Sequence, residues 1–437
     1  MPSPSVRSRP PAITAAVASS GDVSPWATLH GDLVRLVGWR VLAVDLLDYV
    51  RLRAVCRYWR SSTVTPLGRG IIDPRFHPRR WMMLPEGHGL HPREDAKKRF
   101  FNLSSGVFVR PRLPLLKYHF VLCPADGLLL LLQGQQYHRC NRVRLLHPFT
   151  GDVVELPANI ILPADMTLPE ELRAHSIPPT DAFAAVSTSP DGVLGVMVAF
   201  KNSSFVVFAS TREERWGFFA FGFYPHASPL SFKGELYMMQ DQISAAGWEL
   251  NILRFDPPWQ EHSTVSGLAP SSLLSPKLVA TCSAHIIHSP ELVECDSEIL
   301  IVGYRKVTEM IIYRLADLAR GKIVPVKSIG GNALLFGTKG NPSFSLSAVP
   351  TITGDTIVVA NCIPDKYILQ YHLSSDTWSA RVGGCAEHGC NMECTCSLIN
   401  HMCNSCHCVF KCQSSWNNHS IANNNARHIS ALIGASA

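Results

Sequence analysis

The sequence predicts an α+β multidomain protein in which a small helical module precedes a long, mainly-β domain. Two patterns along the 437 residues predict this order: apolar residues recur at helical spacing between Trp26 and Arg60, and short strand-like runs recur between Trp81 and Trp378. A hydrophobic fraction of 46% with only 17% charged residues excludes an intrinsically disordered chain. The chain is therefore expected to fold around a sizeable core.

The helical module is predicted by apolar residues that lie three and four positions apart. A first set runs from Leu33 to Leu47, and a second set runs from Leu52 to Trp59 after the charged Asp48. The two sets predict amphipathic helices within residues 26–61.

The regions on either side of the module lack this periodicity. Residues 1–25 are rich in Ser, Pro and Ala and are expected to form a disordered leader, with an organellar transit peptide as the alternative. Prolines and glycines recur between Pro66 and Pro78, and they predict a linker over residues 62–80.

The β domain is predicted over residues 81–380 by short apolar runs that end at turn residues. Several turns contain glycine, as in Asp191-Gly192 and Lys233-Gly234, where a positive φ is needed. The predicted strands are Val143–Leu146, Val153–Leu156, Ala184–Ser187, Val193–Phe200, Ser204–Ala209, Trp216–Phe221, Glu235–Met239, Ile299–Tyr304, Met310–Arg314, Ile323–Ile329, Thr356–Ala360 and Tyr367–His372.

Strand content alone leaves the architecture of this domain open. Strands of this number can form one large sandwich, two sandwiches, or a propeller of six or seven blades with roughly 40 to 45 residues per blade. No Trp-Asp pair recurs along the chain, so the familiar propeller repeats are not visible.

Two segments of the helical module resemble an F-box. The first is Trp26-Ala27-Thr28-Leu29 followed by Asp32-Leu33-Val34. The second runs from Asp48 to Arg60 and ends in Arg53-Ala54-Val55-Cys56 with Trp59-Arg60, as in the plant form of the F-box. The chain thus resembles plant F-box proteins.

The β domain carries motifs that are similar to those of the same plant group. Leu145-Leu146-His147-Pro148-Phe149-Thr150-Gly151 is similar to a Leu-Leu-Asn-Pro-x-Thr-Gly signature, and Phe232–Tyr237 and Ser328–Gly337 look like the KIB-type β-propeller. The resemblance covers about Trp26 to Trp378. It implies a six- or seven-bladed propeller for the β domain.

The resemblance also implies a function, that of substrate receptor in an SCF-type ubiquitin ligase. In this family the F-box binds a Skp-type adaptor, which connects it to a cullin, while the propeller binds a target protein for ubiquitination. Such a subunit does no chemistry itself, needs no cofactor, and works in the nucleus or cytoplasm. The implied adaptor-binding residues, which lie either at the adaptor contact or in the packing beneath it, are Leu29, Leu33, Leu36, Val37, Leu47, Leu52, Val55 and Trp59.

One departure from the family pattern favours an alternative. The family's Leu-Pro near the start of the F-box is Leu29-His30 here, which removes the fixed φ that proline gives at a helix entry. The alternative is a protein-binding β-propeller that has a degenerate F-box and acts without an adaptor.

Other classes of function find less support in the sequence. Residues 1–112 contain 18 Lys and Arg against 8 Asp and Glu, but these cations are dispersed without interleaved aromatics, so no nucleic-acid partner is expected. No window is long and apolar enough for a membrane helix. Nucleophile-elbow, phosphate-loop and zinc-protease motifs are absent from the sequence, which predicts a non-enzyme.

The carboxyl-terminal residues 381–437 differ in composition from the rest of the chain. Eight of the 14 cysteines lie there, between Cys385 and Cys412. Only Cys403 and Cys406 have a zinc-type C-x-x-C spacing, so no metal site is assigned, and the weak zinc candidates are Cys403, Cys406, Cys408 and Cys412. The region is expected to be a disordered tail.

Overall fold

The computed structural model describes residues 25–84, 97–133, 142–158, 182–200, 203–223, 225, 227–244, 247–257, 276–306, 308–336, 344–346, 352–361 and 367–379. The chain divides into two compact units, with the boundary between Thr65 and Pro66. The expected leader up to Ser24 and the expected tail from residue 381, with its zinc candidates, lie outside the described residues.

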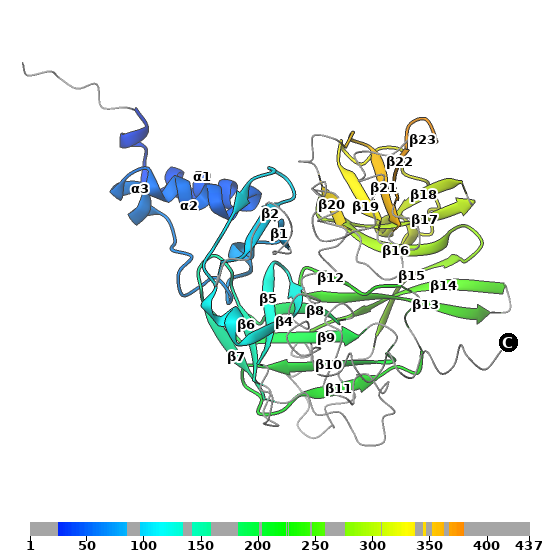
Figure 1. Cartoon of the computed structure of the whole chain (residues 1–437), viewed down its shortest axis with the longest axis horizontal. Coiled ribbons are helices and arrows are strands. Elements are labelled where there is room, and N and C mark those ends of the chain that lie inside the picture. Colours follow the sequence, from blue (N-terminus) through cyan, green and yellow to red (C-terminus); the bar gives the residue numbers. More distant parts are fainter. Residues whose placement is uncertain are drawn as a thin grey trace, which may run out of the picture. The chain divides into compact units, whose positions relative to one another are not determined.

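The first unit contains the predicted helices (Figure 1). After a short 3₁₀ helix η1 (Pro25–Thr28) come α1 (Gly31–Val44), α2 (Leu46–Ala54) and α3 (Arg57–Ser62). Asp45 separates α1 from α2 because its φ of −155° is extended and its carboxylate accepts hydrogen bonds from the amides of Leu47 and Asp48. The first apolar set is therefore two helices.

The helical unit has a small core of its own. Tyr49 is at its centre: its ring stacks on Trp39 with centroids 6.2 Å apart, and its hydroxyl donates to the Val64 carbonyl at 2.7 Å. The buried apolar side chains of the helices are Val34, Leu42, Leu46, Tyr49 and Leu52.

The second unit contains six sheets among the described residues, which we number I to VI along the chain (Figure 1). Sheet I has β1 (Trp81–Leu84), β2 (Arg99–Asn102) and β3 (Phe108–Val109); sheet II has β4 (His119–Ala125), β5 (Leu128–Gln133), β6 (Val143–Leu146) and β7 (Val153–Leu156); sheet III has β8 (Ala182–Thr188), β9 (Leu194–Phe200), β10 (Phe205–Ser210) and β11 (Gly217–Ala220).

The remaining three sheets follow in the same order. Sheet IV has β12 (Leu230–Phe232), β13 (Glu235–Ser244), β14 (Gly247–Phe255) and β15 (Lys277–Ser283); sheet V has β16 (His288–Cys295), β17 (Glu298–Lys306) and β18 (Glu309–Arg314); sheet VI has β19 (Ala333–Phe336), β20 (Phe344–Leu346), β21 (Thr356–Asn361), β22 (Tyr367–His372) and β23 (Thr377–Ser379). Short helices η2 (Pro74–Phe76), η3 (Pro114–Lys117) and α5 (Leu315–Leu318) connect some of them.

Neighbouring strands pair antiparallel throughout, with the exception of β19 and β21, which are parallel. Consecutive strands lie side by side in sheets II to V, which is the meander of a propeller blade. The six sheets settle the architecture that the sequence left open: the domain is a six-bladed β-propeller.

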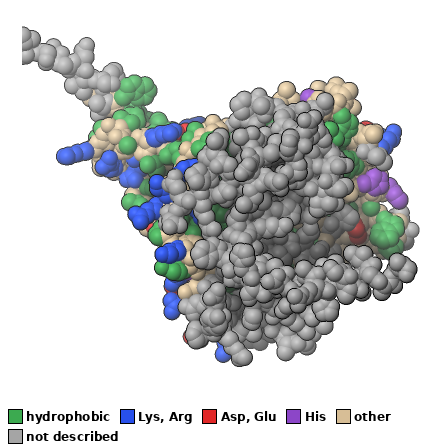
Figure 2. Space-filling model, in the orientation of Figure 1, with side chains coloured by type: hydrophobic (Ala, Val, Ile, Leu, Met, Phe, Trp, Pro, Cys, Tyr) green, Lys and Arg blue, Asp and Glu red, His purple; other side chains and the backbone are tan. Residues whose placement is uncertain are grey.

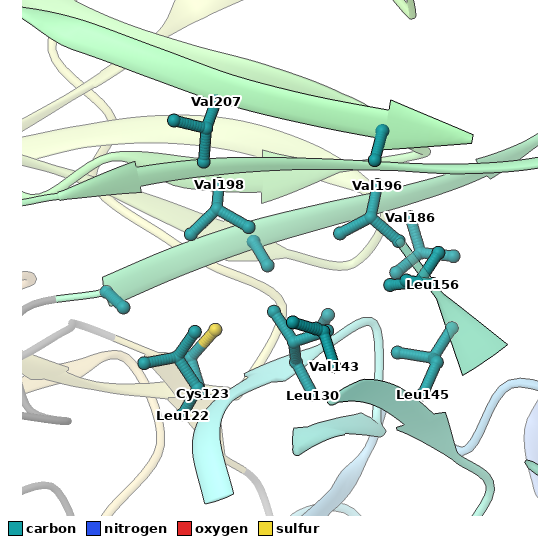
Figure 3. Close-up of a cluster of buried hydrophobic side chains, with 14 of the residues drawn as sticks. Leu122, Cys123, Leu130, Val143, Leu145, Leu156, Val186, Val196, Val198 and Val207 are labelled. Carbon is teal, nitrogen blue, oxygen red and sulfur yellow. The ribbon is translucent and has the colours of Figure 1, made fainter. Parts of the chain in front are cut away.

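The core of the propeller lies between successive sheets. One cluster joins sheets II and III, and Figure 3 shows Val143 and Leu145 on one side of it with Val196 and Val198 on the other. Further clusters join sheet III to IV, IV to V and V to VI. Central strands are thus covered on both faces, and every residue of β9 and β10 is buried.

Most predicted strands are confirmed, but one is wrong. Residues 323–329 form no strand, only an isolated bridge between Pro325 and Tyr313, because Pro325 has no amide hydrogen for a continued ladder. The long strands β14, β15 and β16 were not predicted, since they carry polar residues such as Glu249, Asn251 and Thr281 among the apolar ones.

The segment that was expected to be a linker is divided between the two units. Its first residues close the helical unit, whereas residues 66–80 belong to the second unit. There the Asp152 carboxylate accepts hydrogen bonds from the amides of Gly68 and Gly70, at 3.0 and 2.9 Å, and Ile71 and Phe76 are buried. These residues are an integral part of the propeller. Among the described residues, no helix is long and apolar enough to span a membrane.

Candidate functional site

The helical unit exposes many large apolar side chains for its size. We call these residues the exposed apolar set: Trp26, Leu33, Leu36, Val37, Val44, Val50, Val55 and Tyr58. Four of them lie on α1 at positions that share one helix face. Because exposed apolar side chains gathered on one small unit mark an interaction site more often than a free surface, the set is a candidate partner-binding site.

The eight residues that the resemblance assigned to adaptor binding differ in their exposure to solvent. Leu33, Leu36, Val37 and Val55 are exposed; Leu29, Leu47 and Trp59 are half-buried; and Leu52 is buried. Leu52 packs inside the unit, while the exposed four are available to a partner.

The assignment missed Trp26, Val44, Val50 and Tyr58. Val44 lies two helical turns after Val37 on the same face of α1, so the helical period already contained the signal that identifies it. Trp26 and Tyr58 lie outside this period. Trp26 is tied into the unit by its carbonyl, which accepts from the Trp59 indole at 3.1 Å.

Arginines accompany the exposed apolar set. Residues 25–65 contain six Arg and three Asp and neither Lys nor Glu. Figure 2 shows basic and hydrophobic side chains intermixed over the helical unit. A partner surface with an apolar centre and acidic neighbours would complement this arrangement.

His30 occupies the helix entry where the resembled family has proline. It is the N-cap of α1, with φ of −57°, close to the value that proline would fix. Its Nδ1 accepts a hydrogen bond from the Asp32 amide at 3.4 Å. The departure from the family pattern therefore leaves the start of α1 intact.

A second candidate site is a group of charged and polar residues at or near turns of the propeller, which we call the turn cluster: Arg79, Arg80, Asp126, Ser231, Lys233, Glu294, Asp296 and Asn332. The residues come from the start of sheet I and from sheets II, IV, V and VI. Asp126, Lys233 and Asp296 each lie at the turn between the first two strands of their sheet.

Close backbone packing holds these turns together. Gly127, at φ of +84°, lies so near the chain of sheet I that a β-carbon would overlap the Pro78 carbonyl group. Gly234, next to Lys233, faces Val186 and Ser187 of sheet III in the same way. Glycine is needed here both for positive φ and for the close approach.

The carboxylates of the turn cluster lie at different depths. Asp126 is 4% exposed, and its Oδ2 has no hydrogen-bond partner among the described residues, while Oδ1 accepts from the Ser231 hydroxyl at 3.4 Å. Burial raises the pKa of Asp126 and also that of Glu294. Asp296 is exposed and accepts from the Asn332 amide at 2.6 Å.

The cations of the turn cluster are accessible to solvent and loosely paired. Arg79 lies 4.0 Å from Asp126, and Arg80 lies 3.7 Å from Asp296. Lys233 forms no ion pair with a described residue; its ammonium lies 4.6 Å from the Phe232 ring centroid and 3.5 Å from the Ser297 carbonyl oxygen.

No group of three or more His, Cys, Asp or Glu side chains within the described ranges is arranged to hold a metal ion. The cysteines of that part of the chain are single thiols: Cys123, Cys282 and Cys295 are buried, and Cys56 is half-buried at the start of α3.

Three solved structures are distant likenesses of this chain. An exo-β-1,3-galactanase from Phanerochaete chrysosporium has 9% identity and a TM-score of 0.25, and the match covers 48% of this chain and about half (49%) of that one. The β-propeller domain of the Trilobed protease from Pyrococcus furiosus has 8% identity and a TM-score of 0.27, over 65% and 86% of the two chains.

A third likeness is the Cps50 (Swd1) β-propeller domain of Myceliophteria thermophila, with 12% identity and a TM-score of 0.23, over 69% and 80% of the two chains. TM-scores this low support no inference about this chain. No curated protein matches the sequence.

In contrast to these structures, a protein-family model matches more than half of the chain. The KIB1-4 β-propeller model matches residues 100–381, which include sheets II to VI and part of sheet I. The match is to a propeller domain, which is consistent with a protein-binding domain that is not an enzyme. With six sheets in propeller order and this match over more than half of its length, the chain belongs to the KIB1-4 β-propeller family.

Proposed function

We propose that the protein is a non-catalytic substrate receptor of an SCF-type ubiquitin ligase, in the nucleus or cytoplasm. The helical unit serves as an F-box that binds a Skp-type adaptor and through it a cullin, while the propeller binds the target protein. The resemblance of residues 26–60 to an F-box motivates the first half of the proposal. The propeller family supports the second half.

The exposed apolar set is the observation that carries the proposal. A folded unit of about 40 residues that leaves Leu36 and Val37 in solvent, beside a core that includes Val34 and Leu42, has more apolar surface than it can bury alone. Docking of these side chains into a groove on a partner would remove that surface from water, which favours association by roughly 25 cal/mol per Å² of apolar area.

The role of such a receptor is geometric. Holding a target near a ubiquitin-loaded enzyme raises the effective concentration of the two reactants, and the receptor itself needs no catalytic group. The receptor therefore has partner-binding residues and no catalytic residue.

The test is co-purification of the full-length chain with a co-expressed Skp-type adaptor and cullin. The variant Leu36→Asp/Val37→Asp places charges on two side chains that are 52% and 38% exposed, so the helical unit should still fold. We expect adaptor recovery to fall at least tenfold, since a carboxylate buried without a partner costs more than 1.4 kcal/mol.

A matched control lies in the second unit. Ile323 and Val324 are adjacent and 53% and 58% exposed, and Ile323→Asp/Val324→Asp should leave adaptor recovery unchanged. If the wild-type chain recovers no adaptor, the receptor function is wrong and the alternative of an adaptor-independent propeller stands. Equal losses in both variants would also contradict the assigned surface.

A further inference from the structure

The accessible part of the turn cluster is positively charged. Arg79, Arg80 and Lys233 reach the surface, against one exposed carboxylate, that of Asp296. The other two carboxylates, Asp126 and Glu294, lie deeper. A ligand that approaches from solvent therefore meets three cations and one carboxylate.

None of the three cations is fully satisfied within the described part of the chain. The Arg80 guanidinium donates one short hydrogen bond, to the Ser104 hydroxyl at 2.8 Å, and its carboxylate partner is 3.7 Å away. Arg79 and Asp126 are separated by 4.0 Å, and Lys233 has only a carbonyl and a ring as neighbours. Most of their hydrogen-bonding capacity is left for another group.

The three cations are also held in place. They lie on tight turns whose backbones pack against neighbouring sheets at Gly127 and Gly234. Lys233 itself has a φ of 52°, a strained value for a lysine. Because a backbone that is arranged before binding loses less entropy on association, cations carried on these turns suit anion recognition.

We propose that the turn cluster binds an acidic or phosphorylated segment of a partner protein, with Arg79, Arg80 and Lys233 as the anion-binding side chains. Clusters of cations on rigid turns are a recurring solution for recognition of phosphorylated and acidic motifs. The proposal deepens the protein-binding role of the propeller, but it does not require adaptor binding by the helical unit.

The test uses the purified full-length protein and a labelled peptide of alternating glutamate and serine, with and without phosphate on the serines. Fluorescence anisotropy should show that the phosphorylated peptide binds more tightly than the unphosphorylated one. Binding should weaken when the ionic strength rises from about 0.05 M to about 0.3 M, because the Debye length shortens. Inorganic phosphate at the same concentration as the peptide should not displace it.

The diagnostic variant is Arg80→Gln/Lys233→Asn, since asparagine tolerates the left-handed backbone at position 233. It should weaken peptide binding at least tenfold. The matched control, Arg305→Gln/Lys306→Gln, removes the same two types of charge at the far end of β17 and should bind like wild type.

Three outcomes would overturn the proposal. The first is equal binding by the turn-cluster variant and the wild type. The second is no detectable binding of either peptide, and the third is efficient displacement by inorganic phosphate, which would indicate a site for a free anion. Because no adaptor is present in the titration, each result is independent of the co-purification test above.

Discussion

Single residues determine how closely the sheets of this propeller can approach one another. Gly127 and Gly192 both have positive φ at β-turns, but their surroundings differ. Gly127 touches the backbone of a neighbouring sheet, whereas nothing lies within 4 Å of the position that a β-carbon on Gly192 would occupy. The same residue type thus has a packing role at one turn and a purely conformational role at the other.

This contrast predicts different costs for the same substitution. Gly192→Ala should lower the free energy of unfolding by about 1–2 kcal/mol, the cost of a left-handed backbone for alanine. Gly127→Ala should cost about 2–5 kcal/mol, because the overlap with Pro78 adds about 1–3 kcal/mol to the same backbone cost. Urea unfolding of the two variants measures the difference, and equal losses would refute the close-packing role of Gly127.

At the scale of elements, buried His147 connects residues 66–80 to sheet II, and buried His77 holds that segment together internally. His147 Nδ1 accepts hydrogen bonds from the amides of Phe149 and Thr150, and its Nε2 donates to the Phe76 carbonyl at 3.0 Å. His77 Nε2 contacts the Ile71 carbonyl at 2.8 Å. The Leu-Leu-Asn-Pro-x-Thr-Gly signature has asparagine at the position of His147. In this chain the Nδ1 atom of His147 accepts the hydrogen bonds of the turn instead.

Both histidines should make the fold sensitive to acid. Burial lowers the pKa of His77 and of His147 from 6.5 to about 4. Between pH 6.5 and pH 4 the two histidines are protonated in the unfolded chain but stay neutral in the folded chain. The contribution of neutral His77 and His147 to the free energy of unfolding is therefore complete above about pH 6.5 and is lost as the pH falls towards 4. The loss is on the order of 3 kcal/mol for each histidine.

His147→Asn keeps an acceptor for the two amides and removes one titrating group. We expect its free energy of unfolding to fall less steeply between pH 6.5 and pH 4 than that of wild type. His285 is exposed, and His285→Asn should leave the pH dependence unchanged. Parallel pH profiles for wild type and His147→Asn, measured by chemical denaturation, would contradict the assignment.

The strands that the sequence predicted differ in a simple physical way from those that it did not. β9 and β10 are covered on both faces and appear as unbroken apolar runs. β14 carries the polar residues Glu249, Asn251 and Arg254 among its apolar ones, so no unbroken apolar run marks it, although Leu250 to Leu253 are all buried. The helical period identified the apolar face of α1, whereas β9 was identified as an unbroken apolar run because both of its faces are covered.

The turn cluster was beyond sequence reasoning. Its residues come from five segments between Arg79 and Asn332, and each one is an ordinary turn or strand-end residue in its own segment. Only the packing of separate sheets against one another brings Asp126 near Arg79 and Asp296 near Arg80. No local pattern encodes those distances.

At the scale of the whole molecule, the boundary at Thr65 and Pro66 predicts which fragments fold. A fragment of residues 66–437 should retain the β-sheet circular-dichroism spectrum of the parent and bind the acidic peptides, but it should not recover an adaptor. A fragment of residues 81–437 lacks Ile71, Phe76 and the partners of Asp152, so it should unfold at lower urea concentration. Equal stability of the two fragments would show that residues 66–80 contribute nothing.

The two hydrogen bonds that the Asp152 carboxylate accepts from the amides of Gly68 and Gly70 also have a mechanical consequence. Any pulling force applied to the chain through the helical unit enters the propeller at Pro66 and meets these two bonds first, followed by the bond from His147 to Phe76. A force that arrives along the chain loads the two Asp152 bonds together. The anchor would thus delay the transmission of tension to β1, and the helical unit would extend before the propeller does.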